Sequence, residues 1–587
     1  MVSIDKEPNK DIIQKQNQEL RTTSYEQALE SLQSLLSKFP DSFKINILLG
    51  SNELRNNNPD KALEYFTKSH ELGCEENVYK NNIAAVENAY GSELLLKKEY
   101  KPALDHFLKA LKLIITDPLL IYVNIHRCYR MLNEFDLAEN VLFEYLKTNK
   151  KSAVVYFNLF EFEEIRKNYF QALTYAKTAY DLTISDNKIV PNQRVQLYVK
   201  YARLLENFGR VNDRIKVLIK AHMIAPTNLY ILNLLAVTFI TIGDYNKADH
   251  YILEAIKLDD NLPFPHTLYA HSTFKSGKID DAKELYDTLI KRFPDHNPLN
   301  PYFAEFCFFC ENYKDAYKYY KNSQSFSSVT KEFINTYAYK ELECLYYQKK
   351  YDDFDNTIKD LVFKDIIRPN IASISSFKAS LTNSIDNYTF SQKPFDAVHS
   401  FDLMEDKDFD RESLIDEFNN SFHPNDFIFN LESSDILNGY QTTGNIFLNN
   451  TKQIQNLKNI IKDQLDVFIN NYQYKNDELV KSWNDDYLLV GKIGKFGKGG
   501  SLKPYIKQMS WVSGIINLSK SDEGLDIYFT SDPYSKNYNT KKNNLIKINQ
   551  SSVQIFPSSI FTFSCPSDID YERLFLFFYA TPKKRYN

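Results

Sequence analysis

The chain has 587 residues, of which 43% are hydrophobic and 25% are charged. A chain of this length is too long for a single hydrophobic core, so we expect several domains or a repeat array. Its 71 Lys and Arg residues against 76 Asp and Glu residues give a net charge of -5, which excludes a bulk positive field that would recruit nucleic acid or an anionic membrane.

The beginning of the chain and its cysteines indicate the compartment. Residues 1–20 are polar and lack the apolar segment of a secretory signal, so we expect a polar N-terminal tail there. No run approaches the roughly 18 apolar residues of a membrane span. Cys307 and Cys310 are close in sequence but have no second pair for a zinc site. We interpret them as core residues, with metal or redox chemistry as the alternative, and expect a cytoplasmic protein.

Glycine and alanine recur with a fixed period in the first two thirds of the chain. The residues that follow this 34-residue spacing are Gly209, Gly243 and Gly277, then Ala248, Ala282 and Ala316, and upstream the pairs Ala28 and Ala62, and Ala138 and Ala172. Small residues let two helices cross closely, and glycine permits the tight turn between them. The period therefore predicts an array of paired amphipathic helices.

One unit shows the pattern fully. From about Asn228 onward, Leu235 and Ala236 fall on the first helix, Gly243 on the turn, and Ala248 and Ala255 on the second helix. This unit resembles the tetratricopeptide repeat, with Ala236, Ala248 and Ala255 at its small-residue positions. Pro294 closes the following unit in the same way, whereas Arg214 replaces the expected alanine in another.

The resemblance to tetratricopeptide repeats covers residues 21–365, or about nine or ten units by their period. It implies an α-helical solenoid whose concave face binds a protein or peptide partner. The alternative is an array that only supports the rest of the chain or a homodimer. We expect neither a nucleic-acid partner nor a membrane partner.

Beyond the repeats the pattern changes twice. Residues 366–396 lose the period and gain Ser, Thr and Asn, which predicts a linker. Residues 397–587 then predict a mainly β domain, because β-branched and aromatic residues gather in short runs separated by turn residues. The runs are DYLLVGKI, WVSGIINL, GLDIYF, NLIKIN, SVQIFP and RLFLFFYA. An apolar stripe predicts one helix through Ile454, Leu457, Ile461, Leu465 and Phe468.

Glycine is concentrated in this last region, where nine of the 15 glycines lie between Gly439 and Gly524. Three further features accompany it: a tryptophan turn at 511–514, an FPS turn at 556–558, and the Glu572 and Arg573 pair at the start of the last strand. Together they resemble the iron(II) and 2-oxoglutarate-dependent oxygenases over residues 397–583. The resemblance implies a double-stranded β-helix of the jelly-roll or cupin-like type, so the whole chain is expected to be an α+β multidomain protein.

The oxygenase family holds iron with a facial triad that contains two histidines. The resemblance places Tyr505, Lys507 and Thr562 at the three ligand positions, and no histidine follows His423 in the sequence. A lysine ammonium repels a cation, and neutral hydroxyl oxygens are weak ligands. We therefore expect no iron, no cofactor and no catalysis. The alternative is an active oxygenase with unusual ligands or one completed by the histidines of a partner.

Two positively charged features remain. The resemblance places Arg573 where the family binds the distal carboxylate of 2-oxoglutarate, so retained binding of this or a similar acid is one hypothesis and an ion pair with a local Asp or Glu is the other. Lys492, Lys495, Lys498, Lys503 and Lys507 alternate with glycines. Their spacing does not match a phosphate-binding loop, and we interpret them as a solvated strand edge, with phosphate or nucleic-acid contact as the alternative.

Overall fold

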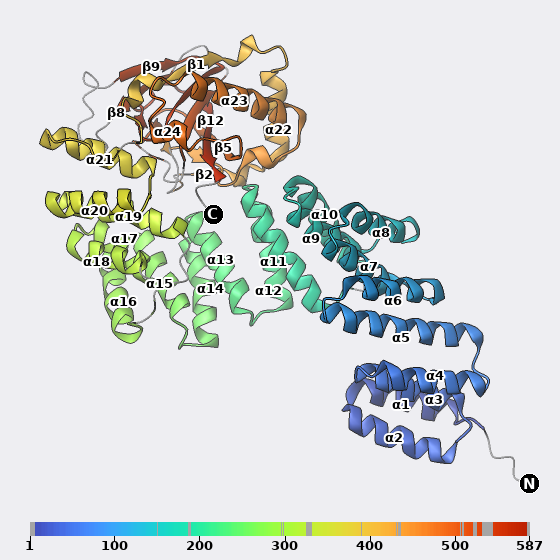
Figure 1. The fold of residues 1–587 in the computed structure, drawn as a ribbon. Helices are drawn as coiled ribbons and strands as arrows, with labels where there is room; N and C mark the ends of the chain where they lie inside the picture. Colours follow the sequence, from blue (N-terminus) through green and yellow to red (C-terminus); the bar gives the residue numbers. More distant parts are fainter. Residues whose placement is uncertain are drawn as a thin grey trace, which may run out of the picture. The chain divides into compact units, whose positions relative to one another are not determined.

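The computed structural model of the chain forms two compact units, Met1–Val190 and Pro191–Asn587 (Figure 1). It describes residues 6–149, 151–185, 189–294, 296, 299–324, 331–388, 390–429, 431, 436–504, 506, 510–519, 525–530 and 544–583. The first unit is helical. The second contains further helices followed by a region of β-sheet (Figure 1).

Consecutive helices of the first unit pack as antiparallel pairs joined by short turns (Figure 1). They are α1 Lys10–Thr22, α2 Tyr25–Lys38, α3 Phe43–Arg55, α4 Pro59–Glu71, α5 Glu76–Leu96, α6 Tyr100–Leu113, α7 Leu119–Met131, α8 Phe135–Thr148, α9 Ala153–Ile165 and α10 Tyr169–Leu182. Short connections of this kind favour helices that pack on their neighbours in sequence. The helical repeat predicted from the 34-residue period is confirmed.

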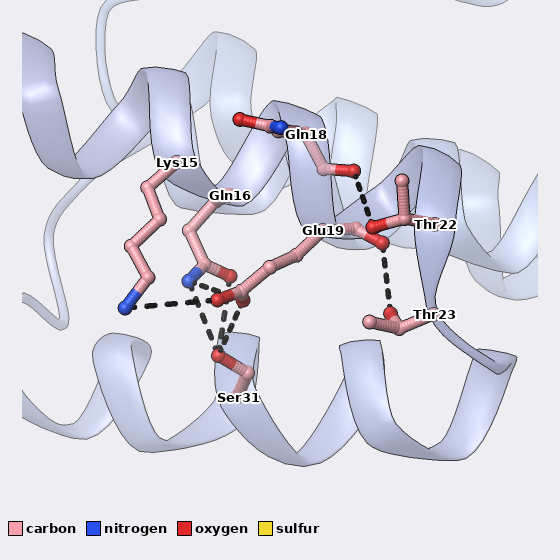
Figure 2. Close-up of polar contacts among 7 residues, drawn as sticks. All are labelled: Lys15, Gln16, Gln18, Glu19, Thr22, Thr23 and Ser31. Carbon is pink, nitrogen blue, oxygen red and sulfur yellow. Dashed lines mark hydrogen bonds and ion pairs between the residues drawn. The ribbon is translucent and has the colours of Figure 1, made fainter.

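Helix α1 lies where the sequence predicted a polar tail. Its apolar side chains Ile13 and Leu20 are seven residues apart, so they share one face and pack on the cluster around Leu32 and Ile45. A polar contact supplements this packing: Gln16, only 5% exposed, donates through Nε2 to Ser31 Oγ of α2 at 3.1 Å (Figure 2). The many polar residues of α1 concealed its narrow apolar stripe, so the predicted tail is in fact the first helix of the array.

The turn within every helix pair from α3 and α4 onward contains one residue with a left-handed backbone. Glycine fills this position at Gly209, Gly243 and Gly277, with φ of 71°, 77° and 87°. Elsewhere the same conformation is adopted by Asn57, Lys98, Asn133, Lys167, Glu311 and Lys349. Because asparagine and exposed charged residues tolerate this region at a modest cost, glycine spacing alone identified only part of the array.

Small residues occupy the helix crossings as predicted. The alanines at the repeat positions are Ala28, Ala62, Ala103, Ala138, Ala172, Ala248, Ala282 and Ala316, and each is at most 2% exposed. Arg214 is the exception, and its guanidinium Nη1 forms an ion pair with Glu206 at 2.7 Å. That pair lets a long side chain occupy a position that is elsewhere filled by a methyl group.

The second unit begins with eleven more helices in its described residues. They are α11 Pro191–Asn207, α12 Val211–Ile224, α13 Leu229–Thr241, α14 Tyr245–Leu258, α15 Pro263–Lys275, α16 Ile279–Arg292, α17 Leu299–Phe309, α18 Tyr313–Gln324, α19 Lys331–Tyr347, α20 Tyr351–Phe363 and α21 Pro369–Thr382. The first ten form five pairs. Helix α21 is additional and falls within the predicted linker.

Helix α21 differs from the predicted linker because its isoleucines and two of its four serines, Ser373 and Ser375, are buried in the fold. Ile371 and Ile374 are fully buried and join the main core of this unit. Ser373 Oγ donates to the carbonyl oxygen of Pro369 one turn earlier at 3.1 Å, so its hydroxyl is satisfied within the helix. The Ser-rich composition resembled a loop, but tertiary packing overrides this local preference.

The remaining elements form an antiparallel β region with short helices. They are η1 Pro394–Ala397, β1 His399–Asp402, η2 Leu403–Glu405, α22 Arg411–Ser421, η3 Pro424–Asp426, β2 Ile428–Phe429, β3 Ile436–Leu437, β4 Tyr440–Gln441, η4 Ile446–Leu448, α23 Lys452–Asn471, α24 Glu478–Lys481, β5 Tyr487–Phe496, β6 Ser501–Leu502, β7 Val512–Asn517, β8 Leu525–Thr530, β9 Asn544–Ile548, β10 Ser552–Pro557, β11 Phe561–Phe563 and β12 Arg573–Pro582. All six predicted strand runs are confirmed. Helix α23 contains the predicted stripe, whose five residues are at most 4% exposed.

The described strands form three sheets. Their orders are β1-β10-β7-β12-β5-β4-β2, β11-β8-β9, and β3-β6. Residues along β12 alternate between two cores, as a pleated strand requires. Leu576, Phe578 and Ala580 pack with α19 to α23 on one face of the large sheet, whereas Phe575 and Phe577 pack with the small sheets on the other. The jelly-roll connectivity implied by the resemblance stays a prediction.

Inside the second unit, the turn between α11 and α12 is joined to the β region. Asn445 N donates to the carbonyl oxygen of Asn207 at 2.8 Å. Asp426, only 2% exposed, accepts from Asn212 N at 2.9 Å and so caps the first turn of α12. Gly209 and Gly444 meet backbone to backbone, with no room for a Cβ at Gly444. The β region therefore depends on a repeat that precedes it by more than two hundred residues.

Candidate functional site

Thr562, the one described position where the resemblance implies a metal ligand, lies in the core between the large sheet and the small sheets. A cavity of about 20 Å³ lies there. Its walls comprise Leu502, Ile506, Ser513, Gly514, Ile515, Phe556, Ser558, Ile560, Thr562, Phe577 and Tyr579. A cavity of this volume holds about one water molecule. Aromatic and branched side chains therefore fill the space that a substrate would need.

The tryptophan turn and the FPS turn meet at one end of this cavity. Trp511 is fully buried and accepts through its carbonyl oxygen from Ser558 N at 3.0 Å. The hydroxyls of Ser513 and Ser558 are 2.6 Å apart, and Ser558 Oγ donates to Ser510 Oγ at 2.9 Å. The two turns that carry the sequence resemblance are thus joined by a buried chain of hydroxyls. The sequence analysis did not single out these serines, although a serine within an otherwise apolar strand run is the signal that marks them.

The structure places one of the three predicted ligand positions. Thr562 lines the cavity and pairs with Phe529 between β11 and β8. Tyr505 and Lys507 lie outside the described residues. His423, the last histidine of the sequence, is at η3, where its Nδ1 accepts from Asn425 N at 3.1 Å. It caps a turn and does not line the cavity.

Iron does not fit the donor set of this cavity. Its lining offers hydroxyls from Ser513, Ser558, Thr562 and Tyr579 together with apolar side chains. Ferrous sites use imidazole and carboxylate groups, and neutral hydroxyls are weaker donors. Among the described residues, no group of three His, Cys, Asp or Glu side chains is arranged to hold a metal ion.

Arg573 is buried at the start of β12 and has no acidic partner in the described chain. By strand alternation its side chain shares the face of Phe575 and Phe577, beside the stacked rings of Phe496 and Phe575. It is 4% exposed, and its Nε and Nη1 atoms are buried without a hydrogen-bond acceptor. The alternative that Arg573 pairs with a local Asp or Glu is therefore wrong for the described residues. Glu572 instead contacts Lys495 at 3.6 Å.

The described lysines among the glycines do not form a solvated strand edge. Lys492 and Lys495 belong to β5, which lies between β12 and β4 inside the large sheet. Lys498 follows β5, Lys503 follows β6, and Lys507 lies outside the described residues. Lys492 is 8% exposed. Lys495 Nζ lies 4.3 Å from the centre of the Phe427 ring, and Lys498 pairs with Asp570 at 3.1 Å. The edge interpretation fails because β4 and β2 extend the sheet beyond β5, and their short runs gave little sequence signal.

The two neighbouring cysteines have different environments. Cys307 is 3% exposed in a core of repeat helices, and burial raises the pKa of its thiol to about 12. Cys310 is exposed at the end of the same helix. Core packing is therefore confirmed for Cys307 and wrong for Cys310, which falls three residues later, just beyond the end of α17.

The matches to known protein families fall on the helical part of the chain. Models of the tetratricopeptide repeat match residues 18–70, 229–262 and 271–296. No curated protein sequence matches the chain. None of the family models that match falls on the β region, so the oxygenase resemblance has no support from them.

Solved structures match parts of the chain with TM-scores below 0.5. The C-terminal part of a TPR repeat-containing protein from Cytophaga hutchinsonii is 18% identical, with a TM-score of 0.32, over 42% of this chain and 97% of its own. Yeast Tom70 is 14% identical, with a TM-score of 0.32, over 64% of this chain and 89% of its own. The TPR domain of P58(IPK) is 16% identical, with a TM-score of 0.20, over 58% of this chain and 98% of its own.

None of the described helices combines the length and the apolar character of a membrane span. The family models, the helix pairs and the buried alanines agree with one another. The helical part of this chain therefore contains tetratricopeptide repeats.

Proposed function

We propose that the protein is an interaction scaffold whose tetratricopeptide repeats bind a protein or peptide partner, and that its β region is a non-catalytic, oxygenase-like module. The observation that carries the scaffold is the series of helix pairs α1 to α20 in the described residues. Arrays of stacked helix pairs present extended concave surfaces that suit a peptide or a protein.

Cross-linking tests the scaffold. A photoreactive cross-linker applied to the full-length protein in cells, followed by mass spectrometry, maps which segments touch a partner. We expect partner cross-links on helices within residues 10–363 that disappear when the array is unfolded by a core substitution. Partner cross-links confined to the β region would contradict the proposal.

The filled interior supports a non-catalytic β region. Its cavity of about 20 Å³ is lined by hydroxyls and apolar groups, whereas bound small molecules occupy pockets of several hundred Å³. Equilibrating the protein anaerobically with iron(II) and 2-oxoglutarate provides the test. We expect no bound iron after desalting and no charge-transfer absorbance. Stoichiometric iron would favour the alternative of an active oxygenase with unusual ligands or with histidines from a partner.

One observation favours a second activity for the β region, the binding of a small carboxylic acid at Arg573. A buried guanidinium without an acceptor is costly, and a carboxylate satisfies it with two parallel hydrogen bonds. Calorimetric titration with 2-oxoglutarate, without metal, tests this activity. We expect measurable heat from the wild type and none from Arg573→Met. Equal heats from both proteins, or none from either, would exclude an acid site at Arg573.

A further inference from the structure

A second and much larger pocket lies in the β region, away from the filled interior. Its volume is about 700 Å³. Three segments form its walls: the end of β1 with η2, the beginning of α22, and the turn between β9 and β10. The lining residues are Asp402, Met404, Phe409, Asp410, Arg411, Glu412, Asn549, Gln550 and Ser551. Pockets of this size accommodate small molecules or a few residues of a peptide.

Hydrogen bonds join two of the walls to each other and tie the third to Leu518, just beyond the end of β7. Leu403 N donates to the carbonyl oxygen of Ser551 at 3.0 Å, and Ser551 N donates to that of Asn517 at 2.8 Å. Arg411 Nη2 donates to the carbonyl oxygen of Leu518 at 2.8 Å. The pocket is therefore preorganised, and a ligand would not need to order it first.

Two buried polar groups of the lining lack partners. Arg411 is 8% exposed. Its Nη1 pairs with the Glu412 carboxylate, and its Nη2 donates to the carbonyl oxygen of Leu518. Its Nε is buried without an acceptor among the described residues. Ser551 is 1% exposed, has a left-handed backbone with φ of 57°, and leaves its hydroxyl unpartnered. Buried donors are normally satisfied. These two therefore call for an acceptor that the described residues do not supply.

The charge around these donors is negative. Residues 402–417 contain eight Asp and Glu residues against one Lys and one Arg, and Asp402, Asp410 and Glu412 line the pocket itself. The side chain of Glu412 is 68% exposed. Met404 adds an exposed apolar side chain to the lining. A ligand must therefore bring positive charge together with a hydrogen-bond acceptor.

We propose that this pocket binds a short basic peptide segment. A Lys or Arg side chain of the segment pairs with Asp402 and Glu412, its aliphatic stem lies on Met404, and a main-chain carbonyl accepts from Arg411 Nε and from the Ser551 hydroxyl. A peptide combines cation, stem and acceptor within a few atoms. This inference concerns a different surface from the repeats, so it does not depend on the proposed scaffold.

Other cations match the pocket less well. A polyamine offers positive charge and N–H donors but no acceptor for Arg411 Nε. A divalent cation requires several oxygen ligands at about 2.0–2.6 Å, and in the described residues Asp402, Asp410 and Glu412 do not form a group that could hold one. The acceptor requirement separates a peptide from both.

Fluorescence anisotropy with a labelled peptide of alternating Lys and Ala tests the proposal on the full chain. We expect saturable binding that weakens as salt increases, because exposed charge pairs are screened. Spermidine and a Glu-Ala peptide of equal length should compete poorly. A photoreactive version of the Lys-Ala peptide should cross-link to segments 402–412 and 549–551.

Two variants separate this pocket from diffuse surface charge. Asp402→Asn with Glu412→Gln should weaken peptide binding about tenfold or more, whereas Asp416→Asn, on the same acidic segment but not in the pocket lining, should change it less than twofold. Ser551→Ala removes a hydroxyl without a partner, so it should leave thermal stability unchanged and weaken binding about fivefold.

Each of the following outcomes would overturn the proposal. The first is an unchanged affinity of the double variant for the labelled Lys-Ala peptide, and the second is an equal loss of that affinity in Asp416→Asn. The third is displacement of the labelled peptide by spermidine as strong as by unlabelled peptide, and the last is peptide cross-links confined to the repeats. The last outcome would still be compatible with the scaffold, so failure of the two ideas can be told apart.

Discussion

At the scale of single residues, burial in this chain changes the chemistry of side chains that look ordinary in sequence. Glu341 on α19 is 6% exposed, and burial raises the pKa of its carboxyl to about 8, although the charges of Lys321 and Lys364 act in the opposite direction. Such a carboxyl is protonated in the folded protein at neutral pH. In the unfolded chain it titrates near its ordinary value of about 4.3.

This difference predicts how stability depends on pH. The folded state binds the Glu341 proton more tightly than the unfolded state. The contribution of Glu341 to the free energy of unfolding is therefore greatest below about pH 4.3, and it is lost as pH rises through about 8. Glu341→Gln should remove that loss, which is at most on the order of 5 kcal/mol. Urea unfolding between pH 5 and 9 measures it.

The exposed Glu284→Gln serves as the control for Glu341→Gln and should keep the pH dependence of the wild type. If the difference in unfolding free energy between wild type and Glu341→Gln were constant over this pH range, Glu341 would not titrate with folding. Sequence reasoning did not single out Glu341, because its burial depends on neighbouring helices.

At the scale of elements, the array depends on close helix crossings. Ala248 on α14 is fully buried at a repeat position. Ala248→Arg should lower the free energy of unfolding by about 3 kcal/mol or more, because a long charged side chain cannot be accommodated or paired there. The urea midpoint of the 191–587 fragment reports the change, with the exposed Asn246→Arg on the same helix as its control. Equal midpoints for the two variants would contradict the crossing.

The joint between a repeat turn and the β region gives a second prediction at this scale. A Cβ at Gly444 would overlap the backbone of Gly209, whereas a Cβ at Gly497 would meet its nearest atom, the Tyr571 carbonyl oxygen, at 3.5 Å. Gly444→Ala should therefore lower the free energy of unfolding by about 2 kcal/mol, and the melting temperature with it. Gly497→Ala should leave it nearly unchanged. Hydrogen exchange at Asn445 N, which bonds Asn207, should rise only in the first variant.

At the scale of the whole molecule, the β region shares one of its two cores with the repeat helices. The main core of the second unit includes Leu342, Leu345 and Phe354 from repeat helices together with Leu576 and Phe578 from β12. The domain boundaries of residues 397–587 stay a prediction. The helices before residue 397 supply one wall of that core.

Truncation tests this shared core. A fragment of residues 191–587 should be soluble and unfold cooperatively, whereas a fragment of residues 397–587 should aggregate or expose enough apolar surface to bind a hydrophobic dye. Size-exclusion chromatography and dye fluorescence distinguish the two. A stable monomeric 397–587 fragment would show that the helices are dispensable for the sheet.

Local pattern predicted much of this fold. The 34-residue period, the six strand runs and helix α23 were readable because each depends on neighbours within a few turns or one strand. Helix α1 and helix α21 were not, since their polar residues are satisfied by neighbouring helices and by their own backbone. The candidate interior was predicted from turn motifs, but its filling by Phe556, Phe577 and Tyr579 requires knowing which strands face one another.

The amino-acid sequence by itself determined the repeats, the strands and the absence of histidine after His423, because these are properties of order and composition. Only the tertiary structure decided that Arg573 is buried without an acidic partner among the described residues, that β5 lies inside its sheet, and that Arg411 and Ser551 share a preorganised pocket. The physical reason is that burial and hydrogen-bond satisfaction arise between residues far apart in the chain, whose proximity depends on the complete fold.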